Sequence, residues 1–165
     1  MTSVEASSSW ALAGGAQPPR LPEGIDLPRD RMLVMGILNV TPDSFSDGGR
    51  FLDPGAALDH AQEMLDEGAD LVDLGGESTR PNSTRISEDE EWERIGSIIQ
   101  RLAASGVVVS VDTLHALTAR RAADAGAAII NDVSGGRWDP QMNAAVASTS
   151  CAYVIQHYRA LPGMP

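Results

Sequence analysis

From residue 32 onward, short apolar runs alternate with segments in which apolar residues recur every three or four positions. The first kind of pattern predicts buried strands, and the second predicts amphipathic helices. Continuous apolar strands that alternate with helices indicate βα units around a parallel sheet. The predicted strands cover residues 32–38, 70–75, 107–112, 128–132 and 152–157.

Capping residues and glycines predict where the helices between these strands begin and end. Asp followed by Pro suits the N-cap and first helical position, and Ser followed three residues later by Glu forms a capping box. Glycine suits the C-terminal end because it adopts the left-handed backbone conformation without strain. The predicted helices run from Pro54 to Gly68, from Ser87 to Gly106, from Thr113 to Gly126 and from Asp139 onward.

Two architectures fit the predicted order β–α–β–α–β–α–β–α–β. One is a doubly wound sheet of five strands. The other is part of a βα barrel of the triosephosphate-isomerase type, of which the chain supplies about five of eight βα units. Residues 1–30 carry neither pattern, and we predict a disordered N-terminal segment there, followed by one α/β domain over 31–165.

Composition narrows the classes of partner. The 165 residues include 12 basic and 23 acidic side chains and no lysine, which gives a formal net charge of −11. Such a chain is poorly suited to nucleic acid or to an anionic membrane surface, and no apolar run is long enough for a transmembrane helix. The one cysteine, Cys151, allows no intrachain disulfide and indicates a reducing, cytoplasmic setting.

Polar side chains follow each predicted strand at its carboxyl end, where parallel α/β proteins place their ligands. Helix capping would explain any one of them, but five together favour a binding or catalytic site. The five positions are Asn39, the segment GGESTRP at 75–81, Asp112, Asn131 with Asp132, and His157.

The types of these residues indicate a chemistry. A carboxylate and an amide side by side, Asp112 and Asn131, can bind the N–H edge of a heterocycle. The guanidinium of Arg80 suits a phosphate, and the oxygen ligands of Asn39 and Asp47 suit Mg²⁺. Together they indicate transfer chemistry on a phosphate or diphosphate ester.

Four motifs in succession resemble the signatures of the dihydropteroate synthase family. They are GILNVTPDSFSDGG (36–49), DLVDLGGESTRP (70–81), VSVDT (109–113) and IINDVSGG (129–136). The resemblance implies a pterin-binding βα barrel that joins 6-hydroxymethyl-7,8-dihydropterin diphosphate to p-aminobenzoate. The products are 7,8-dihydropteroate for folate synthesis and diphosphate, and sulfonamides compete for the p-aminobenzoate site.

The resemblance also implies roles at the strand ends. Asn39 matches the family's magnesium ligand, and Asp47 matches a second ligand on a mobile loop. Asp112 and Asn131 match the residues that hydrogen-bond the pterin.

Two loops carry the remaining implied roles. Thr79 and Arg80 match residues near the diphosphate and the p-aminobenzoate, and Phe45 and Pro81 match apolar residues that close over the p-aminobenzoate ring. The implied reaction is dissociative: diphosphate departs, and the arylamine attacks a cation-like pterin methylene. Positioning and electrostatic stabilisation of the leaving group would carry most of the rate.

The sequence departs from the family pattern in two respects. The family's later strands supply a further aspartate, a lysine and an arginine–histidine pair that this sequence lacks. In the last strand Gln156 stands for a methionine and Ala160 for a glycine, while the role of His157 stays open between packing and binding. We therefore expect weak or no activity from this chain alone.

Three functions stay open at this point. The first is dihydropteroate synthase activity, with a homodimer in the full-length form. The second is a non-catalytic or methyl-transfer-type pterin-binding module, and the third is a doubly wound sheet that binds another phosphate ester. The loop TPDSFSDGG (41–49) favours the first, because methyl-transfer relatives are not expected to carry it.

Overall fold

The computed structural model describes residues 25, 27–28, 30–41, 53–78 and 84–156, and these residues form one α/β unit. The five predicted strands and four predicted helices are all present. In chain order the elements are β1 (Met35–Asn39), α1 (Pro54–Asp66), β2 (Leu71–Gly75), α2 (Glu88–Ala104), β3 (Val109–Asp112), α3 (Ala116–Asp124), β4 (Ile129–Asp132), α4 (Met142–Ala147) and β5 (Ala152–Ile155).

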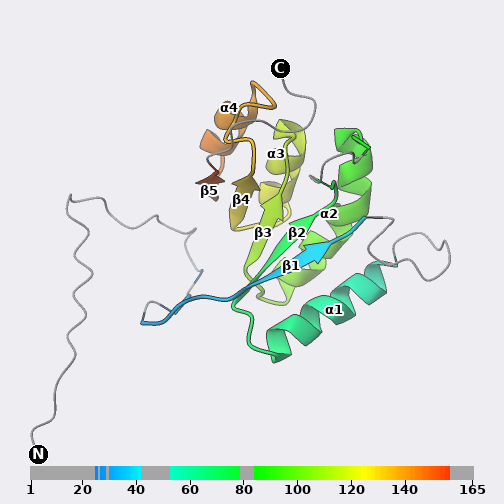
Figure 1. Cartoon of the computed structure of the whole chain (residues 1–165), viewed down its shortest axis with the longest axis vertical. Helices are drawn as coiled ribbons and strands as arrows, with labels where there is room; N and C mark the ends of the chain where they lie inside the picture. The colour runs from blue at the N-terminus through cyan, green and yellow to red at the C-terminus, as the bar shows by residue number, and fades with distance from the viewer. Residues whose placement is uncertain (1–24, 26, 29, 42–52, 79–83, 157–165) are drawn as a thin grey trace, which may run out of the picture.

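The strands form a single parallel sheet in the order β1-β2-β3-β4-β5. In Figure 1 they lie side by side in chain order, with β1 and α1 at one end of the sheet and β5 and α4 at the other. A doubly wound sheet reverses its strand order at a switch point, and this sheet does not. The order therefore agrees with a partial barrel, as predicted.

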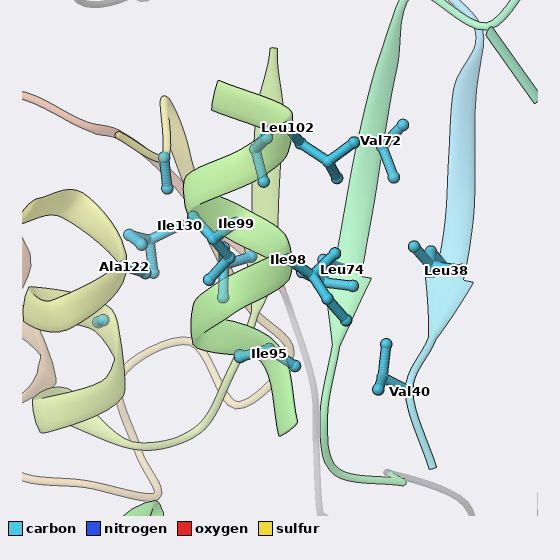
Figure 2. Close-up of a cluster of buried hydrophobic side chains, with 14 of the residues drawn as sticks. Leu38, Val40, Val72, Leu74, Ile95, Ile98, Ile99, Leu102, Ala122 and Ile130 are labelled. Carbon is cyan, nitrogen blue, oxygen red and sulfur yellow. The ribbon is translucent and has the colours of Figure 1, made fainter. Parts of the chain in front are cut away.

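The main core lies between one face of the sheet and all four helices. Alternate strand residues point to this face, and Leu38, Leu74, Val111 and Ile130 share one register row on it. Figure 2 shows the side chains of α2 between the strands, with Ile98 directed toward Leu74. Because successive strand residues point to opposite faces, the rows on either side of this one face away from the helices.

The helix starts confirm two predictions and correct two. Gly55 donates its amide to Asp53 (2.9 Å), and Glu90 donates its amide to the Ser87 hydroxyl (3.2 Å), so both caps are as expected. The helix predicted to begin at Thr113 begins at Ala116, because the Thr113 hydroxyl donates to Glu91 instead of capping α3.

The fourth helix also begins later than predicted, at Met142 instead of Asp139. The Asp139 carboxylate accepts from the amides of Gln141 and Ala116, at 2.8 and 2.9 Å. This residue therefore organises the turn before α4 and ties it to the first turn of α3. Both corrections have the same cause, since a side chain that resembled a cap has a partner elsewhere in the fold.

Each end of the sheet exposes apolar side chains. On β1, Met35 and Ile37 are 43% and 62% exposed, and on β5, Val154 and Ile155 are 44% and 61% exposed. Edge strands of a parallel sheet are normally covered, so this exposure fits an unclosed barrel. Among the described residues, no helix combines the length and apolar character that crossing a bilayer requires.

Candidate functional site

Four residues from four neighbouring strands form one row at the carboxyl edge of the sheet. The register pairs Asn39 with Gly75, Gly75 with Asp112, and Asp112 with Asn131. The row directly before it is the helix-facing row of Leu38, so these four residues point to the opposite face. The structure thus brings together three of the predicted site residues, Asn39, Asp112 and Asn131, on the face free of helices.

Asp112 is the electrostatic centre of this row. The pKa of its carboxyl group is raised to about 7. Burial is the main cause, and the nearby carboxylates of Asp73 and Glu91 add to it. Its Oδ1 is buried and has no hydrogen-bond partner among the described residues. An unpaired buried acceptor is costly, so this group is suited to a ligand that donates hydrogen bonds.

Asn131 is held on both sides of its amide. Its Nδ2 donates to Asp73 Oδ2 (3.1 Å), and its Oδ1 accepts from Gln156 Nε2 (2.9 Å). Asn131 and Asp73 are only 6% and 5% exposed. The side chain next to Asp112 therefore has one fixed orientation, with one N–H and one acceptor position remaining for a ligand.

Gly75 lies between Asn39 and Asp112 in this register row. A Cβ built on Gly75 would lie 3.5 Å from Asn39 Oδ1 and 3.7 Å from the Asp112 Cβ. The Asn39 oxygen and the Asp112 side chain therefore flank this glycine at the strand ends, and an amide oxygen is a ligand type that suits a hard cation such as Mg²⁺. Asp47, the other predicted metal ligand, lies outside the described residues, and within the described part of the chain no cluster of three or more acidic, histidine or cysteine side chains is suited to a metal.

A second polar cluster joins the loops that follow β2, β3 and β4. Glu77 Oε1 accepts from Arg85 (2.9 Å), and Glu77 Oε2 lies 3.0 Å from His115 Nε2. The Arg85 guanidinium stacks over Trp138, 4.7 Å from the ring centre. Glu77 is 6% exposed, and through His115 it links the segment after β2 to the start of α3.

The pKa values in this cluster reflect its pairing. Burial alone would raise the pKa of Glu77, but hydrogen bonds from His115 and Arg85 bring it below its ordinary value. The hydrogen bond to Glu77 is the main reason that the pKa of His115 is raised. Both shifts favour the charged forms of the two groups.

Several predicted residues lie outside the described residues, and their predicted roles stay predictions: Phe45, Asp47, Thr79, Arg80, Pro81, Ala160 and His157. Asp132, which also ends a strand, has a structural role. Its carboxylate accepts from the amides of Ser134 and Gly136 and from the Tyr153 hydroxyl. It therefore organises the turn after β4.

Sequence reasoning missed Asp73 and Glu77. Asp73 stands inside the apolar run of β2, where it was taken as part of a buried strand. It lies two residues before Gly75, and residues two apart in a strand share a face. That spacing, which puts a carboxylate below the polar row, was the available signal.

Comparisons with known proteins agree with this geometry. The family described as "Pterin binding enzyme" matches residues 35–165. A dihydropteroate synthase of Mycobacterium leprae is 52% identical over 126 residues, which cover 76% of this chain and 44% of that protein.

Solved structures give the same result. Dihydropteroate synthase from Xanthomonas albilineans with 4-aminobenzoic acid is 46% identical, with a TM-score of 0.74, over 79% of this chain and 48% of that one. The Burkholderia cenocepacia enzyme complexed with 7,8-dihydropteroate is 37% identical, with a TM-score of 0.75, over 87% and 48%. The chain thus spans about half the length of each of these three proteins.

Proposed function

Because this chain belongs to the pterin binding enzyme family, we propose that it acts in the dihydropteroate synthase reaction of folate biosynthesis. It would bind 6-hydroxymethyl-7,8-dihydropterin diphosphate and p-aminobenzoate, and the reaction would release diphosphate. The observation that carries the proposal is the single register row of Asn39, Gly75, Asp112 and Asn131. The activity of these relatives, dihydropteroate synthase, and the ligands in their structures support it.

The row suits the pterin ring because of what Asp112 and Asn131 can exchange with it. A pterin carries an amino group and a ring N–H on one edge, and both are donors. A carboxylate without a partner accepts such donors, and binding them favours its charged form. Asn131 adds one N–H and one acceptor in a fixed orientation. Asp112 and Asn131 together would therefore distinguish a pterin from a ring whose edge carries acceptors where the pterin carries donors.

The chemical step itself would depend on positioning. With the pterin held on the strand ends, its methylene carbon would lie toward the loops that follow β1 and β2, where the nucleophile and the leaving diphosphate meet. Thr79 and Arg80 would bind anionic groups, and Phe45 and Pro81 would exclude water from the p-aminobenzoate ring. Holding the reactants in line is the main contribution that such a site makes to the rate.

A magnesium ion is part of the proposal. Asn39, at the carboxyl end of β1, and Asp47 would hold it. When bound, it would neutralise charge on the departing diphosphate. A cytoplasmic location, on the grounds of composition, and a homodimer of the full-length form complete the proposal.

The test measures binding of 6-hydroxymethylpterin to the 165-residue chain, and the fluorescence of the pterin reports the binding. We expect saturable binding and a loss of about 30-fold or more for Asp112→Ala, since the pair of donors on the ring would lose its acceptor. Asp59→Ala, an exposed change on α1, is the matched control and should bind as the parent does.

Turnover gives the second measurement. With Mg²⁺, the pterin diphosphate and p-aminobenzoate, we expect weak or no release of dihydropteroate from this chain alone. Equal pterin affinity in the parent and in Asp112→Ala would contradict the proposed function. Activity close to that of a complete dihydropteroate synthase would contradict the expectation of weak activity.

A further inference from the structure

The side chain of Asn131 is fixed by two partners that come from different parts of the sheet. Asp73 belongs to β2, two strands away from β4, and Gln156 follows the last residue of β5. The β3 residue opposite Asp73 is Ser110, whose short side chain leaves room for the carboxylate to reach Asn131. The amide is therefore bridged from both sides.

The chemistry of the two partners determines which way the amide points. An ionised carboxylate only accepts hydrogen bonds, so Asp73 requires the Asn131 Nδ2 on its side. The Asn131 oxygen then faces β5, where Gln156 donates to it at 2.9 Å. A reversed amide would place two acceptor oxygens against each other in a buried site, where such a contact is costly.

We propose that Asp73 and Gln156 are positioning residues that fix the Asn131 amide in one orientation and thereby determine the heterocycle that the site accepts. The proposal rests on the proposed function for the identity of the ligand. Neither residue needs to touch the ring. They act through Asn131, which is the register partner of Asp112, whose Oδ1 has no hydrogen-bond partner among the described residues.

The experiment compares two ligands that differ in the group at ring position 2 and in the hydrogen on the neighbouring N1. Pterin-6-carboxylate carries an amino donor at position 2, and lumazine-6-carboxylate carries an oxo acceptor there. We expect the parent chain to prefer the pterin. Gln156→Glu replaces the donor with a group that only accepts, and Asp73→Asn gives the other partner a donor. Each change should reduce the preference ratio by about fivefold or more.

Two further variants separate positioning from general damage. Gln156→Met removes the hydrogen bond but keeps the length of the side chain, and should reduce the ratio less than Gln156→Glu does. Gln100→Glu makes the same change in charge on the exposed face of α2 and should leave the ratio unchanged. A purely structural role would weaken both ligands equally, and an unchanged ratio in Gln156→Glu and Asp73→Asn would overturn the proposal.

A measurement without ligand separates this proposal from the proposed function. The side-chain amide of Asn131 gives its own ¹⁵N–¹H signals, and we expect them to shift and to exchange faster in Asp73→Asn and Gln156→Glu. Unchanged signals would overturn the positioning of Asn131, whatever the chain binds. Shifted signals in a chain that binds neither ligand would support the positioning and contradict the proposed function.

Discussion

Asp112 and Glu77 are two carboxylates at the same edge of the sheet, and their surroundings are opposite. Asp112 has an oxygen with no partner among the described residues, and its pKa is raised to about 7 by burial and by neighbouring carboxylates. Glu77 has a partner for each oxygen, Arg85 and His115. Those partners outweigh burial and lower its pKa.

The difference indicates which group holds the fold and which serves a ligand. Removing one partner of a buried ion pair strongly destabilises the folded protein, because the other charge is left buried without a partner. A buried acceptor without a partner destabilises the folded chain, and natural proteins retain such groups where function needs them. We therefore expect Glu77 to belong to the framework and Asp112 to the candidate site.

The largest effect that this comparison predicts is on stability. Glu77→Ala should lower the free energy of unfolding by about 3–5 kcal/mol, because it leaves Arg85 and His115 without their carboxylate. Asp112→Ala should lower it by less than about 1 kcal/mol or raise it. Urea denaturation at pH 7.5 measures both.

The control for that pair is Glu63→Ala. Glu63 is on α1, and its carboxylate is 68% exposed beside His60. Exposed pairs contribute little, so its effect should lie within about 0.5 kcal/mol. Equal losses in Glu77→Ala and Asp112→Ala would mean that both carboxylates belong to the framework.

The next effect is on the pH dependence of stability. The folded pKa of Asp112 is raised from 3.8 to about 7, so its contribution to stability is fully present below pH 4 and is lost as pH rises toward 7. Asp112→Asn does not titrate. Between pH 5 and pH 7, the variant should therefore gain about 2 kcal/mol of stability relative to the parent.

The measurement is urea denaturation of both chains at half-unit steps from pH 4.5 to 8. The stability difference should grow steadily and level off above pH 7.5. A difference that is constant across this range would show that the Asp112 carboxyl is solvated in the folded chain. Asp59→Asn on α1 supplies the control, with no expected slope.

The sequence predicted the strands, the helices and the polar strand ends, because hydrophobic periodicity and polar strand ends are local signals. Asn39, Asp112 and Asn131 were all expected at strand ends, and they lie in one row. The partners of these residues were not predictable in the same way. The contact of Asn131 with Asp73 joins residues 58 positions apart, and that of Glu77 with His115 joins residues 38 apart.

The wrong helix starts have the same explanation. Thr113 was expected to cap a helix, but its hydroxyl donates to Glu91, 22 residues away. A local rule cannot include a partner that only the tertiary fold provides. Polar residues in apolar runs, such as Asp73, are therefore the positions at which sequence reasoning most needs a structure.

His115 provides a smaller effect that sharpens the comparison above pH 7. Its folded pKa is raised above 6.5, so its stabilising contact with Glu77 is fully present below pH 6.5 and is lost as pH rises through the folded pKa. The acidic groups that face it are Glu77, Glu91 and Glu88. His115→Lys keeps the positive charge. The His115 side chain makes no helix-capping hydrogen bond, so the substitution removes none.

The measurement uses an Asp112→Asn background, which removes the titration of Asp112. With His115 in place, the free energy of unfolding should fall by about 1 kcal/mol between pH 6.5 and 9. His115→Lys should lose less than half of that. Thermal unfolding across this pH range measures the difference. Identical pH profiles would mean that the contact of His115 with Glu77 contributes nothing as an ion pair.

The smallest predicted effect concerns how Arg85 holds Glu77. Its guanidinium pairs with the carboxylate and stacks over Trp138 from the loop after β4. Arg85→Lys keeps the charge but loses the flat stacking surface, so stability should fall by about 0.5–1 kcal/mol. Trp138→Leu should cost a similar amount, and the double variant should cost less than the sum, because both changes remove one contact. Full additivity in urea denaturation would show that the stacked pair is not coupled. In that case the contact of Glu77 with His115 would hold this part of the edge without help from the stacked pair.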